Sequence, residues 1–319
     1  MHYAILGAGG TGGTIGFHLA QAGLDVTLLA RGETLRAVRR QGLTIRRLWR
    51  RDSVSVPIRA VTTEDYRETP DVLFVCVKSY SLPQVLPFLQ RVCGAQTIVL
   101  PILNVFGTGR RLQRELPEAV VLDGCIYVSA EREAPGVLRQ HGEILRVVYG
   151  RRSGERLRES ASDDTWKTQI DRRLQAIAGD LSASGITPQL SAHIERDCLE
   201  KFSYVSPIGT AGLCLQATAG DFQTDGRARE LFKTLIGEIS ALAAAMGFAL
   251  HEDMVQRNLA ILDTLNPSAT TSLQRDLEAG RPSEIDGLIY ETVRQGERFH
   301  VPTPAYRAAA RLCRAKFGG

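Results

Sequence analysis

Several features are scarce or absent in this chain of 319 residues, and each absence removes a class of protein. No apolar run approaches the roughly 20 residues that a membrane-spanning helix needs, so we expect no membrane partner. The first residues have no basic flank, apolar segment or cleavage signal of a secretory leader, which favours a cytoplasmic protein. The six cysteines are dispersed without a C-x-x-C pair, which favours free thiols. The six histidines do not cluster either, and we predict no metal site.

Lysine is scarce as well: the chain has five, at positions 78, 167, 201, 233 and 316, among 39 basic residues. Positive charge is therefore carried mostly by arginine. The arginine-rich stretch "RAVRRQGLTIRRLWRR" could indicate nucleic-acid binding. However, 35 acidic residues reduce the net charge to +4, and no aromatic residues interleave with the arginines in a binding pattern. We expect a solvated surface and no nucleic-acid partner.

The first half of the chain alternates short apolar runs with amphipathic stretches. The runs predict strands at 3–6, 25–30, 72–78, 97–103 and 120–128, and the stretches predict helices at 11–22, 32–41, 81–91 and 107–115. This alternation is typical of a parallel sheet covered by helices on both faces. We also expect a hairpin at a sheet edge from "GVLRQHG" and "EILRVVYG", and a polar surface insertion over 151–173 leading into a helix near 164–183.

The pattern changes near residue 194. Long amphipathic stretches follow at 195–216, 226–247, 251–265 and 284–299, a last helix follows "VPTP", and strand signals vanish. We therefore predict an α/β fold in which residues 1–192 form a Rossmann-type, doubly wound parallel sheet and residues 193–319 form an all-helical C-terminal domain. Helical domains of this sort often bury an apolar face against a second copy, so we keep a homodimer as an expectation.

The opening "YAILGAGGTGG" contains a G-x-G-x-x-G motif between an apolar strand and an amphipathic helix, as a dinucleotide-binding turn requires. The first glycine permits the tight turn, the second lets a pyrophosphate approach the backbone, and the third allows the helix and strand to pack closely. The amides at the helix start then face the phosphates. The alternative is a purely structural glycine turn. The residues expected to contact the cofactor are Gly7, Ala8, Gly9, Gly10, Thr11 and Gly12.

The end of the next strand distinguishes the two nicotinamide dinucleotides. NAD-binding proteins usually carry a carboxylate there, which binds the ribose 2′-hydroxyl. This chain reads "VTLLARG" and has Arg31 at that point. An arginine suits a 2′-phosphate, so we predict NADP(H) as the cofactor. Because arginine is frequent in this chain, chance placement is the alternative.

Four later stretches, together with the glycine turn, carry a family resemblance. They are "VCVKSY" with Lys78, "ILNVFG" with Asn104, "RDCLEKFSYV" with Lys201, and "TTSLQRDLEAGRPSEIDGLI" with Ser272 and Glu284. In this order, and over nearly the whole chain, they resemble the ketopantoate reductase (2-dehydropantoate 2-reductase) family. The resemblance implies NADPH-dependent reduction of a small 2-oxo acid to a 2-hydroxy acid in a cleft between the domains. In the family, this reaction makes pantoate for pantothenate biosynthesis.

The resemblance also implies a role for each matching residue. Lys201 would be the general acid that protonates the carbonyl oxygen, and Glu284 would orient the cofactor and the catalytic groups. Asn104 would lie beside the nicotinamide and the substrate, and Ser272 would contact the substrate. The remaining cofactor contacts that the resemblance implies are the side chains of Lys78 and Arg31 and the backbone of Ala130.

The residue types support some of these roles independently. Lys78 and Asn104 follow predicted strands, at the edge where ligands collect in open α/β sheets. Hydride addition to a ketone creates an alkoxide that needs a proton, which a desolvated lysine can supply and an arginine cannot. Each residue also has a structural alternative. Lys201 could extend to solvent, Glu284 could stabilise a helix start, Asn104 could belong to a turn, and Ser272 could be polar surface.

Val105 stands where the family usually has a glycine after the asparagine, and four further positions lack amides that the family pattern has. Pantoate-forming reductases typically carry asparagines after the catalytic lysine, where this chain has Val205 and Gly209. Ala219 and Ile289 stand at two further positions where amides are expected. Because amides in a pocket discriminate strongly between substrates, we expect a more apolar pocket and a different 2-oxo acid. Two other functions stay open: an NADP-linked reductase of imines or 3-hydroxy acids, and a non-catalytic protein that senses NADPH.

Overall fold

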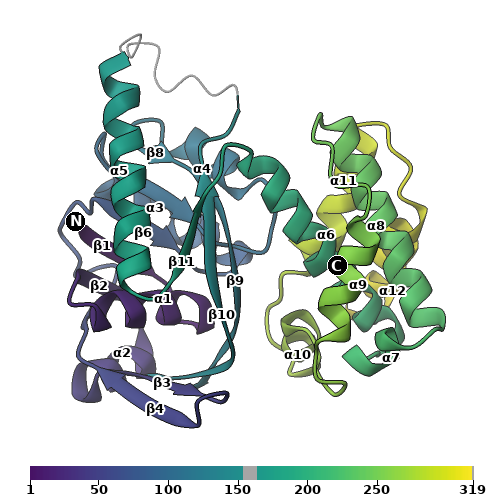
Figure 1. Cartoon of the computed structure of the whole chain (residues 1–319), viewed down its shortest axis with the longest axis horizontal. Coiled ribbons are helices and arrows are strands. Elements are labelled where there is room, and N and C mark those ends of the chain that lie inside the picture. Colours follow the sequence, from purple (N-terminus) through teal and green to yellow (C-terminus); the bar gives the residue numbers. More distant parts are fainter. Residues whose placement is uncertain (154–163, 318–319) are drawn as a thin grey trace. The chain divides into compact units, whose positions relative to one another are not determined.

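The computed structural model describes residues 1–153 and 164–317, and these divide into two compact units. The expected polar insertion lies partly outside the described residues. The first unit is formed by Met1–Val77, Ser81–Leu103 and Gly107–Ile194, and the second by Lys78–Tyr80, Asn104–Phe106 and Glu195–Gly319. Two short segments from the first half of the chain therefore belong to the second, helical unit. Figure 1 shows the elements of both units, coloured along the sequence.

A six-stranded parallel sheet forms the centre of the first unit. Its strands lie in the order β5-β2-β1-β6-β7-β8, and every neighbouring pair is parallel. Renumbered along the chain within this sheet, the order is 3-2-1-4-5-6, that of the dinucleotide-binding Rossmann fold. The predicted Rossmann-type, doubly wound sheet is confirmed. The strands are β1 His2–Leu6, β2 Asp25–Leu29, β5 Arg59–Val61, β6 Val72–Val75, β7 Ile98–Pro101 and β8 Val120–Val121.

Alternate residues of the central strand enter two separate hydrophobic layers. Tyr3 and Ile5 of β1 join one cluster, and Ala4 and Leu6 join the other, because successive side chains of a strand point to opposite faces. Helices α1 Gly10–Gln21, α2 Gly32–Gln41 and α5 Asp164–Ala183 contribute to the first layer, and α3 Leu82–Val92 and α4 Thr108–Glu115 to the second. Helices thus cover both faces, as predicted.

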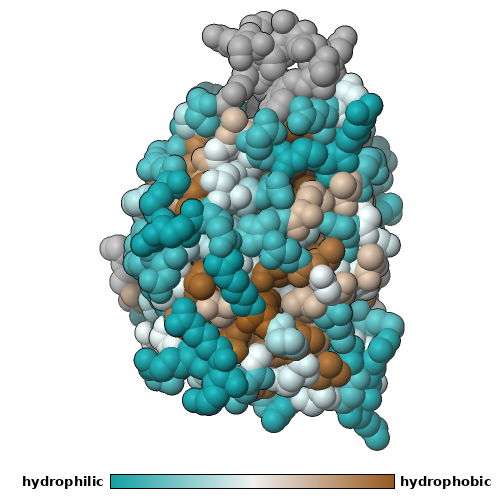
Figure 2. All heavy atoms as spheres, turned by 90° about the vertical axis from the view of Figure 1, so that its left-hand side faces the viewer, coloured by the Kyte–Doolittle hydropathy of each residue, from teal (hydrophilic) through white to brown (hydrophobic). Residues whose placement is uncertain are grey.

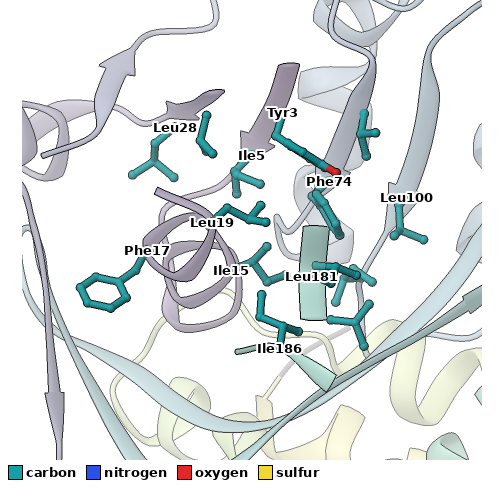
Figure 3. Packing of buried hydrophobic residues seen from close by; sticks show 14 of the residues in the cluster. Tyr3, Ile5, Ile15, Phe17, Leu19, Leu28, Phe74, Leu100, Leu181 and Ile186 are labelled. Atoms are coloured by element: carbon teal, nitrogen blue, oxygen red, sulfur yellow. The ribbon is translucent and has the colours of Figure 1, made fainter. Parts of the chain in front are cut away.

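Figure 3 shows the first of these layers around α1. Leu19 of α1 lies beside Ile5 of the sheet, and Ile15 of the same helix lies beside Leu181 and Ile186. All five side chains are at most 1% exposed, so this helix is fixed tightly against the sheet. The packing holds the N-terminus of α1 directly after β1, where the glycine turn lies.

A second, mixed sheet in the first unit was not predicted. Its order is β11-β10-β3-β4, and β9 pairs with β10 on the other side. Strand β3 lies within the arginine-rich stretch and buries Leu43 and Ile45, while Arg46 is exposed and donates to Glu133 at 2.8 Å. The bounds are β3 Leu43–Arg47, β4 Asp52–Val56, β9 Asp123–Ala134, β10 Val137–Gly150 and β11 Thr187–Leu190.

The predicted hairpin between 136–142 and 143–150 is wrong. Both segments belong to the single strand β10, whose antiparallel partner is β9. The chain reverses instead before β10, at Gly136, which has a φ of 75°. Gly142 falls at an irregularity in the β9–β10 register, so it interrupts the pairing without turning the chain. Gly142 therefore marks a bulge within a strand and not the turn that the sequence predicted.

Within residues 195–317, every element of regular structure is helical. This confirms the predicted all-helical character of the C-terminal domain. Two short helices, α7 and α10, were not predicted. Several helices pack around one buried cluster that includes Phe202, Phe232, Ile236 and Tyr306. The helices are α6 Ile194–Leu215, α7 Ala219–Gln223, α8 Arg227–Ala245, α9 Met254–Asp263, α10 Ser272–Glu278, the π-helical turn η2 Asp286–Tyr290, α11 Glu291–Arg298 and α12 Pro304–Phe317.

Helix α6 continues through Pro207 because a side chain from α9 supplies the missing donor. Pro207 has no N–H, so the carbonyl of Ser203, four residues earlier, loses its usual helical partner. Asn258 Nδ2 lies 3.0 Å from that carbonyl oxygen and donates to it. Asn258 is only 2% exposed, so a buried carbonyl would otherwise stay unsatisfied.

Figure 2 presents one face of the molecule, on which hydrophilic residues dominate and hydrophobic side chains gather in a limited area. The arginine-rich stretch contributes exposed residues such as Arg36, Arg40 and Arg50 to the surface of the first unit. Among the described residues, no helix is both long and apolar enough to cross a membrane.

Candidate functional site

The glycine turn lies where the strand order of the parallel sheet reverses, between β1 and β6. Gly7 has a φ of 110°, which residues with a side chain rarely adopt. A Cβ on Gly7 would lie 2.9 Å from the carbonyl oxygen of Cys76, which follows β6. A Cβ on Gly12 would lie 2.1 Å from the carbonyl oxygen of Gly7. These two glycines are therefore required by the close packing of α1 against the sheet.

Gly9 differs from these two glycines. It is exposed, its φ of −81° suits any residue, and a Cβ at this position would meet nothing within 4 Å. Gly9 is the N-cap of α1, and neither a capping side chain nor an acidic residue lies at the helix start. The first amides of a helix have no intrahelical acceptor, so this end of α1 suits an anion. Ala8 and Thr11 are half-buried beside it.

Gly10 serves the packing of a neighbouring strand. A Cβ there would lie 2.3 Å from the carbonyl oxygen of Ala130, which belongs to β9. The structure thus brings the Ala130 backbone close to the glycine turn, and its expected place beside the nicotinamide stays a prediction. The close approach also explains why "GAGG" has a glycine at a position that the motif itself leaves free.

Arg31 lies directly after β2 and is the N-cap of α2. Its side chain is exposed, and no carboxylate occupies the strand end. The nearby acidic residue, Glu33, forms an ion pair with Arg36 on its own helix. Taken together with the open, anion-accepting start of α1, the residues present fit a dinucleotide with an additional phosphate on its ribose.

The second unit collects the later candidate residues. Lys78 Nζ lies 3.3 Å from Glu284 Oε2 and 3.5 Å from Asp276 Oδ2. The backbone N–H of Ser79, which begins the short 3-10 turn η1 Ser79–Ser81, donates to Glu284 Oε1 at 3.0 Å. Glu284 is 5% exposed, so this carboxylate is held between a lysine and an amide with little access to water.

The charge state of Lys78 follows from these partners. Burial alone would lower the pKa of Lys78, but the negative charges of Glu284 and Asp276 and their hydrogen bonds outweigh it and raise the pKa above its ordinary value. Lys78 is therefore a fixed positive charge that holds its proton.

Lys201 also contacts a polar side chain of the same unit. Its Nζ donates to Asn104 Oδ1 at 2.9 Å. Lys201 lies in the second turn of α6, and Asn104 begins the short segment Asn104–Phe106 that follows β7. An amide oxygen orients an ammonium group without adding the full charge that holds the proton of Lys78.

A close backbone contact lies beside these two pairs. Val105, the neighbour of Asn104, packs onto Gly287 in the π-helical turn, three residues after Glu284. A Cβ on Gly287 would lie 2.5 Å from Val105 Cγ2. The glycine therefore allows the segment that carries Asn104 to lie against the turn that follows Glu284.

Ser272 is exposed at the start of α10, whose N-cap is Thr271. Asp276 lies one helical turn later on the same face, where it contacts Lys78. The structure thus brings Ser272 to the helix that carries the Lys78 site. The contact of its hydroxyl with a substrate stays a prediction.

Sequence reasoning missed Asp276 and Arg281. Arg281 Nη2 donates to Asp276 Oδ1 at 2.9 Å, so the carboxylate bridges Arg281 and Lys78. Both residues belong to "DLEAGRPSEID", in which only Glu284 was singled out. The sequence shows an acidic residue eight positions before Glu284. That this residue lies close to Lys78 could not be predicted, because it depends on helix α10, which was not predicted.

The four positions that lack family amides fall into two groups. Ile289 is 0% and Ala219 3% exposed, and both are buried within the helical unit. Val205 is half-buried, and Gly209 packs against Leu273 beside Ser272. Gly209 is buried like Ile289 and Ala219, and Val205 is the one partly exposed residue of these four.

Metal chemistry has no evident site in the part of the chain that the structure describes. No group of three or more histidine, cysteine, aspartate or glutamate side chains in residues 1–153 and 164–317 is arranged to hold a metal ion. What the arrangement offers is an anion-accepting turn in one unit and, in the other, two lysines with different partners.

Comparisons with known proteins agree over both units. Residues 3–154 match the family model of ketopantoate reductase PanE/ApbA, and residues 193–317 match the model of its C-terminal part. An oxidoreductase of Bacillus subtilis, YkpB, is 24% identical over 304 residues, which cover 95% of each chain. A 2-dehydropantoate 2-reductase of Mesorhizobium japonicum is 25% identical, with 98% of this chain and 97% of the relative covered.

A solved structure extends this similarity to three dimensions. The PanE/ApbA family ketopantoate reductase from Ralstonia eutropha is 25% identical and has a TM-score of 0.84. The alignment covers 99% of this chain and 98% of that chain.

Proposed function

Since the chain belongs to the ketopantoate reductase (PanE/ApbA) family, we propose that it reduces a 2-oxo acid more apolar than ketopantoate, with Lys201 as the proton donor. Membership of this family makes the chain an NADP-dependent oxidoreductase that reduces a 2-oxo acid to a 2-hydroxy acid. The identity of the substrate and the roles of single residues are the parts that we propose.

The observation that carries the proposal is the contact between Lys201 and Asn104, set beside the ion pairs that hold the proton of Lys78. Lys201 contacts the amide of Asn104 at 2.9 Å, whereas Lys78 contacts two carboxylates. A general acid must release its proton near the working pH. The raised pKa of Lys78 opposes this, so Lys201 is the better candidate for the acid.

In the proposed reaction NADPH, when bound, would supply the hydride that the carbonyl carbon of the substrate accepts. Lys201 Nζ then gives its proton to the carbonyl oxygen, where negative charge develops. Asn104 orients the ammonium group through its side-chain oxygen. Glu284 fixes Lys78 and the start of η1 through its two carboxylate oxygens.

The cofactor would be held by the first unit. Gly7 and Gly12 shape the turn, Gly9 leaves room for the pyrophosphate, and the first amides of α1 face it. Arg31, exposed after β2, would bind the 2′-phosphate that distinguishes NADPH from NADH. Contacts of Lys78, Asn104 and the Ala130 backbone with the cofactor stay predictions.

Support for a more apolar substrate comes from Val205 and Gly209. When a substrate lacks a hydroxyl group, a pocket amide that would bind this hydroxyl is left without a partner. A pocket with such an amide therefore prefers substrates that have the hydroxyl. Val205 offers no such group, and Gly209 packs on Leu273. We therefore propose a 2-oxo acid without the hydroxyl group of ketopantoate.

Replacement of Lys201 tests the proton donor. Lys201→Ala should lower kcat about 100- to 10,000-fold, the usual contribution of a general acid, with little change in NADPH affinity. Lys201→Arg should be similarly slow, because arginine keeps the positive charge but does not release a proton. The measurements are steady-state turnover and NADPH binding by fluorescence titration.

Lys233→Ala provides the matched control, since Lys233 is on the surface of α8 and pairs with Glu230 at 2.7 Å. It should leave turnover unchanged. Near-normal kcat in Lys201→Ala would remove Lys201 from this role. Normal kcat in Lys201→Arg would indicate that its charge matters rather than its proton.

The same assay separates the other functions that the sequence left open. Turnover of imines or 3-hydroxy acids in place of 2-oxo acids would favour the related reductases, and NADPH binding without any turnover would favour a sensor. The boundary at residues 192 and 193, the cleft between the domains, the homodimer and the cytoplasmic location stay predictions.

A further inference from the structure

A cavity in the helical unit, away from the two lysine pairs, is lined by two cysteines. It has a volume of about 290 Å³ and lies between the end of α6 and the last turns of α12. Cys214 of α6 and Cys313 of α12 both face it, and Lys316 belongs to the same wall. The proposed reductase mechanism uses none of these residues.

The two thiols are in contact and differ in access. A hydrogen bond joins the side chains of Cys214 and Cys313, so the two sulfur atoms are close together. Cys313 is 1% exposed, whereas Cys214 is half-buried. Leu312, which is 48% exposed, and the exposed Lys316 form part of the cavity wall, so the cavity reaches the surface on the side of α12.

The surroundings also make the two thiols chemically unequal. The hydrogen bond from Cys313 and the positive charge of Lys316 lower the pKa of Cys214 against the opposing effect of burial. The hydrogen bond to Cys214 and burial raise the pKa of Cys313. Cys214 is thus the more accessible thiol and the one that more readily becomes a thiolate.

We propose that Cys214 and Cys313 form a reactive dithiol that low-molecular-weight disulfides oxidise to an intramolecular disulfide. The contact between the thiols, their shared cavity and the exposure of its wall carry this proposal. It does not depend on the reductase activity, because neither cysteine belongs to the proposed catalytic groups.

The reaction is a thiol–disulfide exchange in two steps. The Cys214 thiolate attacks one sulfur of the external disulfide, the external S–S bond breaks, and one thiolate leaves and takes up a proton. Cys313 loses its proton and attacks the Cys214 sulfur of the mixed disulfide, which releases the second external thiol. The two cysteines together lose two hydrogens and two electrons, and the external disulfide gains them.

Mass spectrometry of the full, folded chain after incubation with oxidised glutathione tests the proposal. Wild type should lose the mass of two hydrogen atoms and yield a peptide pair linked through Cys214 and Cys313. Cys313→Ser should instead accumulate a lasting glutathione adduct on Cys214, because the second step is blocked. Cys214→Ser should form neither product.

Cys93→Ser is the matched control. Cys93 is also half-buried, but burial raises its pKa to about 12, and its loss should leave the cross-link unchanged. Wild type that keeps both thiols, that stops at a glutathione adduct on Cys214, or that links either cysteine to another one would overturn the proposal. The wild-type result decides even if a serine variant fails to fold.

Discussion

At the residue scale, the glycines of the turn are present for two separate reasons. Gly12 has no space for a Cβ, which would lie 2.1 Å from the Gly7 carbonyl oxygen. Gly9 has open space on that side and an ordinary backbone conformation. The fold therefore explains Gly12, whereas Gly9 has no packing reason and fits a ligand that approaches the backbone.

Substitution by alanine should separate these reasons. Gly9→Ala should change the free energy of unfolding by less than about 1 kcal/mol, because the methyl group meets no neighbour. It should weaken NADPH binding about 10-fold or more, since the pyrophosphate loses its close approach to the backbone. Gly12→Ala should destabilise the fold by about 2 kcal/mol or more, because the helix must move off the strand.

Differential scanning fluorimetry and NADPH titration measure these two effects. Unchanged NADPH affinity in Gly9→Ala would favour a purely structural turn and contradict the assignment of the cofactor site.

Arg31 is the residue on which the choice of cofactor depends. Arg31→Glu should reduce the preference for NADPH over NADH about 10- to 100-fold, the value of a charge-assisted hydrogen bond. The comparison is kcat/KM with each cofactor, and Arg40→Glu, on the exposed side of α2, is the control. An unchanged preference in Arg31→Glu would mean that another group binds the 2′-phosphate.

The scarcity of lysine helped to identify residues of the candidate site, whereas the spacing of residues along the chain did not predict their contacts. Lysine is rare in a chain that otherwise uses arginine, and two of its five lysines lie in the candidate site. Their partners were not predictable from spacing, because Lys78 meets Glu284 across 206 positions and Lys201 meets Asn104 across 97. Such contacts depend on tertiary packing.

At the element scale, the middle of α6 depends on a side chain from another helix. Asn258 of α9 donates to the Ser203 carbonyl that Pro207 leaves without a partner. The same helix carries Lys201 six residues before the proline. The integrity of α6 is therefore coupled to α9.

A double substitution tests this coupling. Asn258→Leu should cost about 1–3 kcal/mol of unfolding free energy, because a buried carbonyl loses its donor. Pro207→Ala restores a backbone N–H at that position, so in its presence Asn258→Leu should cost less. Urea denaturation of both single variants and the double variant measures the coupling. Equal costs of Asn258→Leu with and without Pro207 would contradict this account.

Long helices were predictable, whereas the full length of strands β9 and β10 and the short helices α7 and α10 were not. The 20-residue helix α5 Asp164–Ala183 begins and ends where its amphipathic pattern predicted. Helix α10 has 7 residues, too few for a periodic pattern, and with it the contact of Asp276 was missed. The strand β10 was split at Gly142, because a glycine at a bulge and a glycine at a turn look alike in sequence.

At the scale of the whole molecule, the order of elements predicted the architecture. Alternation of strands and helices followed by helices alone gave a Rossmann-type first part and a helical second part, and both are confirmed. What the order did not predict is that Lys78–Tyr80 and Asn104–Phe106 group with the helical unit. These segments follow strands of the first unit in sequence, and only contacts in space assign them to the second.

The central claim is that the whole chain is an NADPH-dependent reductase of an apolar 2-oxo acid. The most direct measurement is the oxidation of NADPH by the wild-type chain with ketopantoate and a series of 2-oxo acids bearing aliphatic or aromatic side chains, with NADH in parallel. The account predicts turnover with NADPH, higher kcat/KM for an apolar 2-oxo acid than for ketopantoate, and weaker activity with NADH. Tight binding of NADPH without turnover of any 2-oxo acid would contradict it.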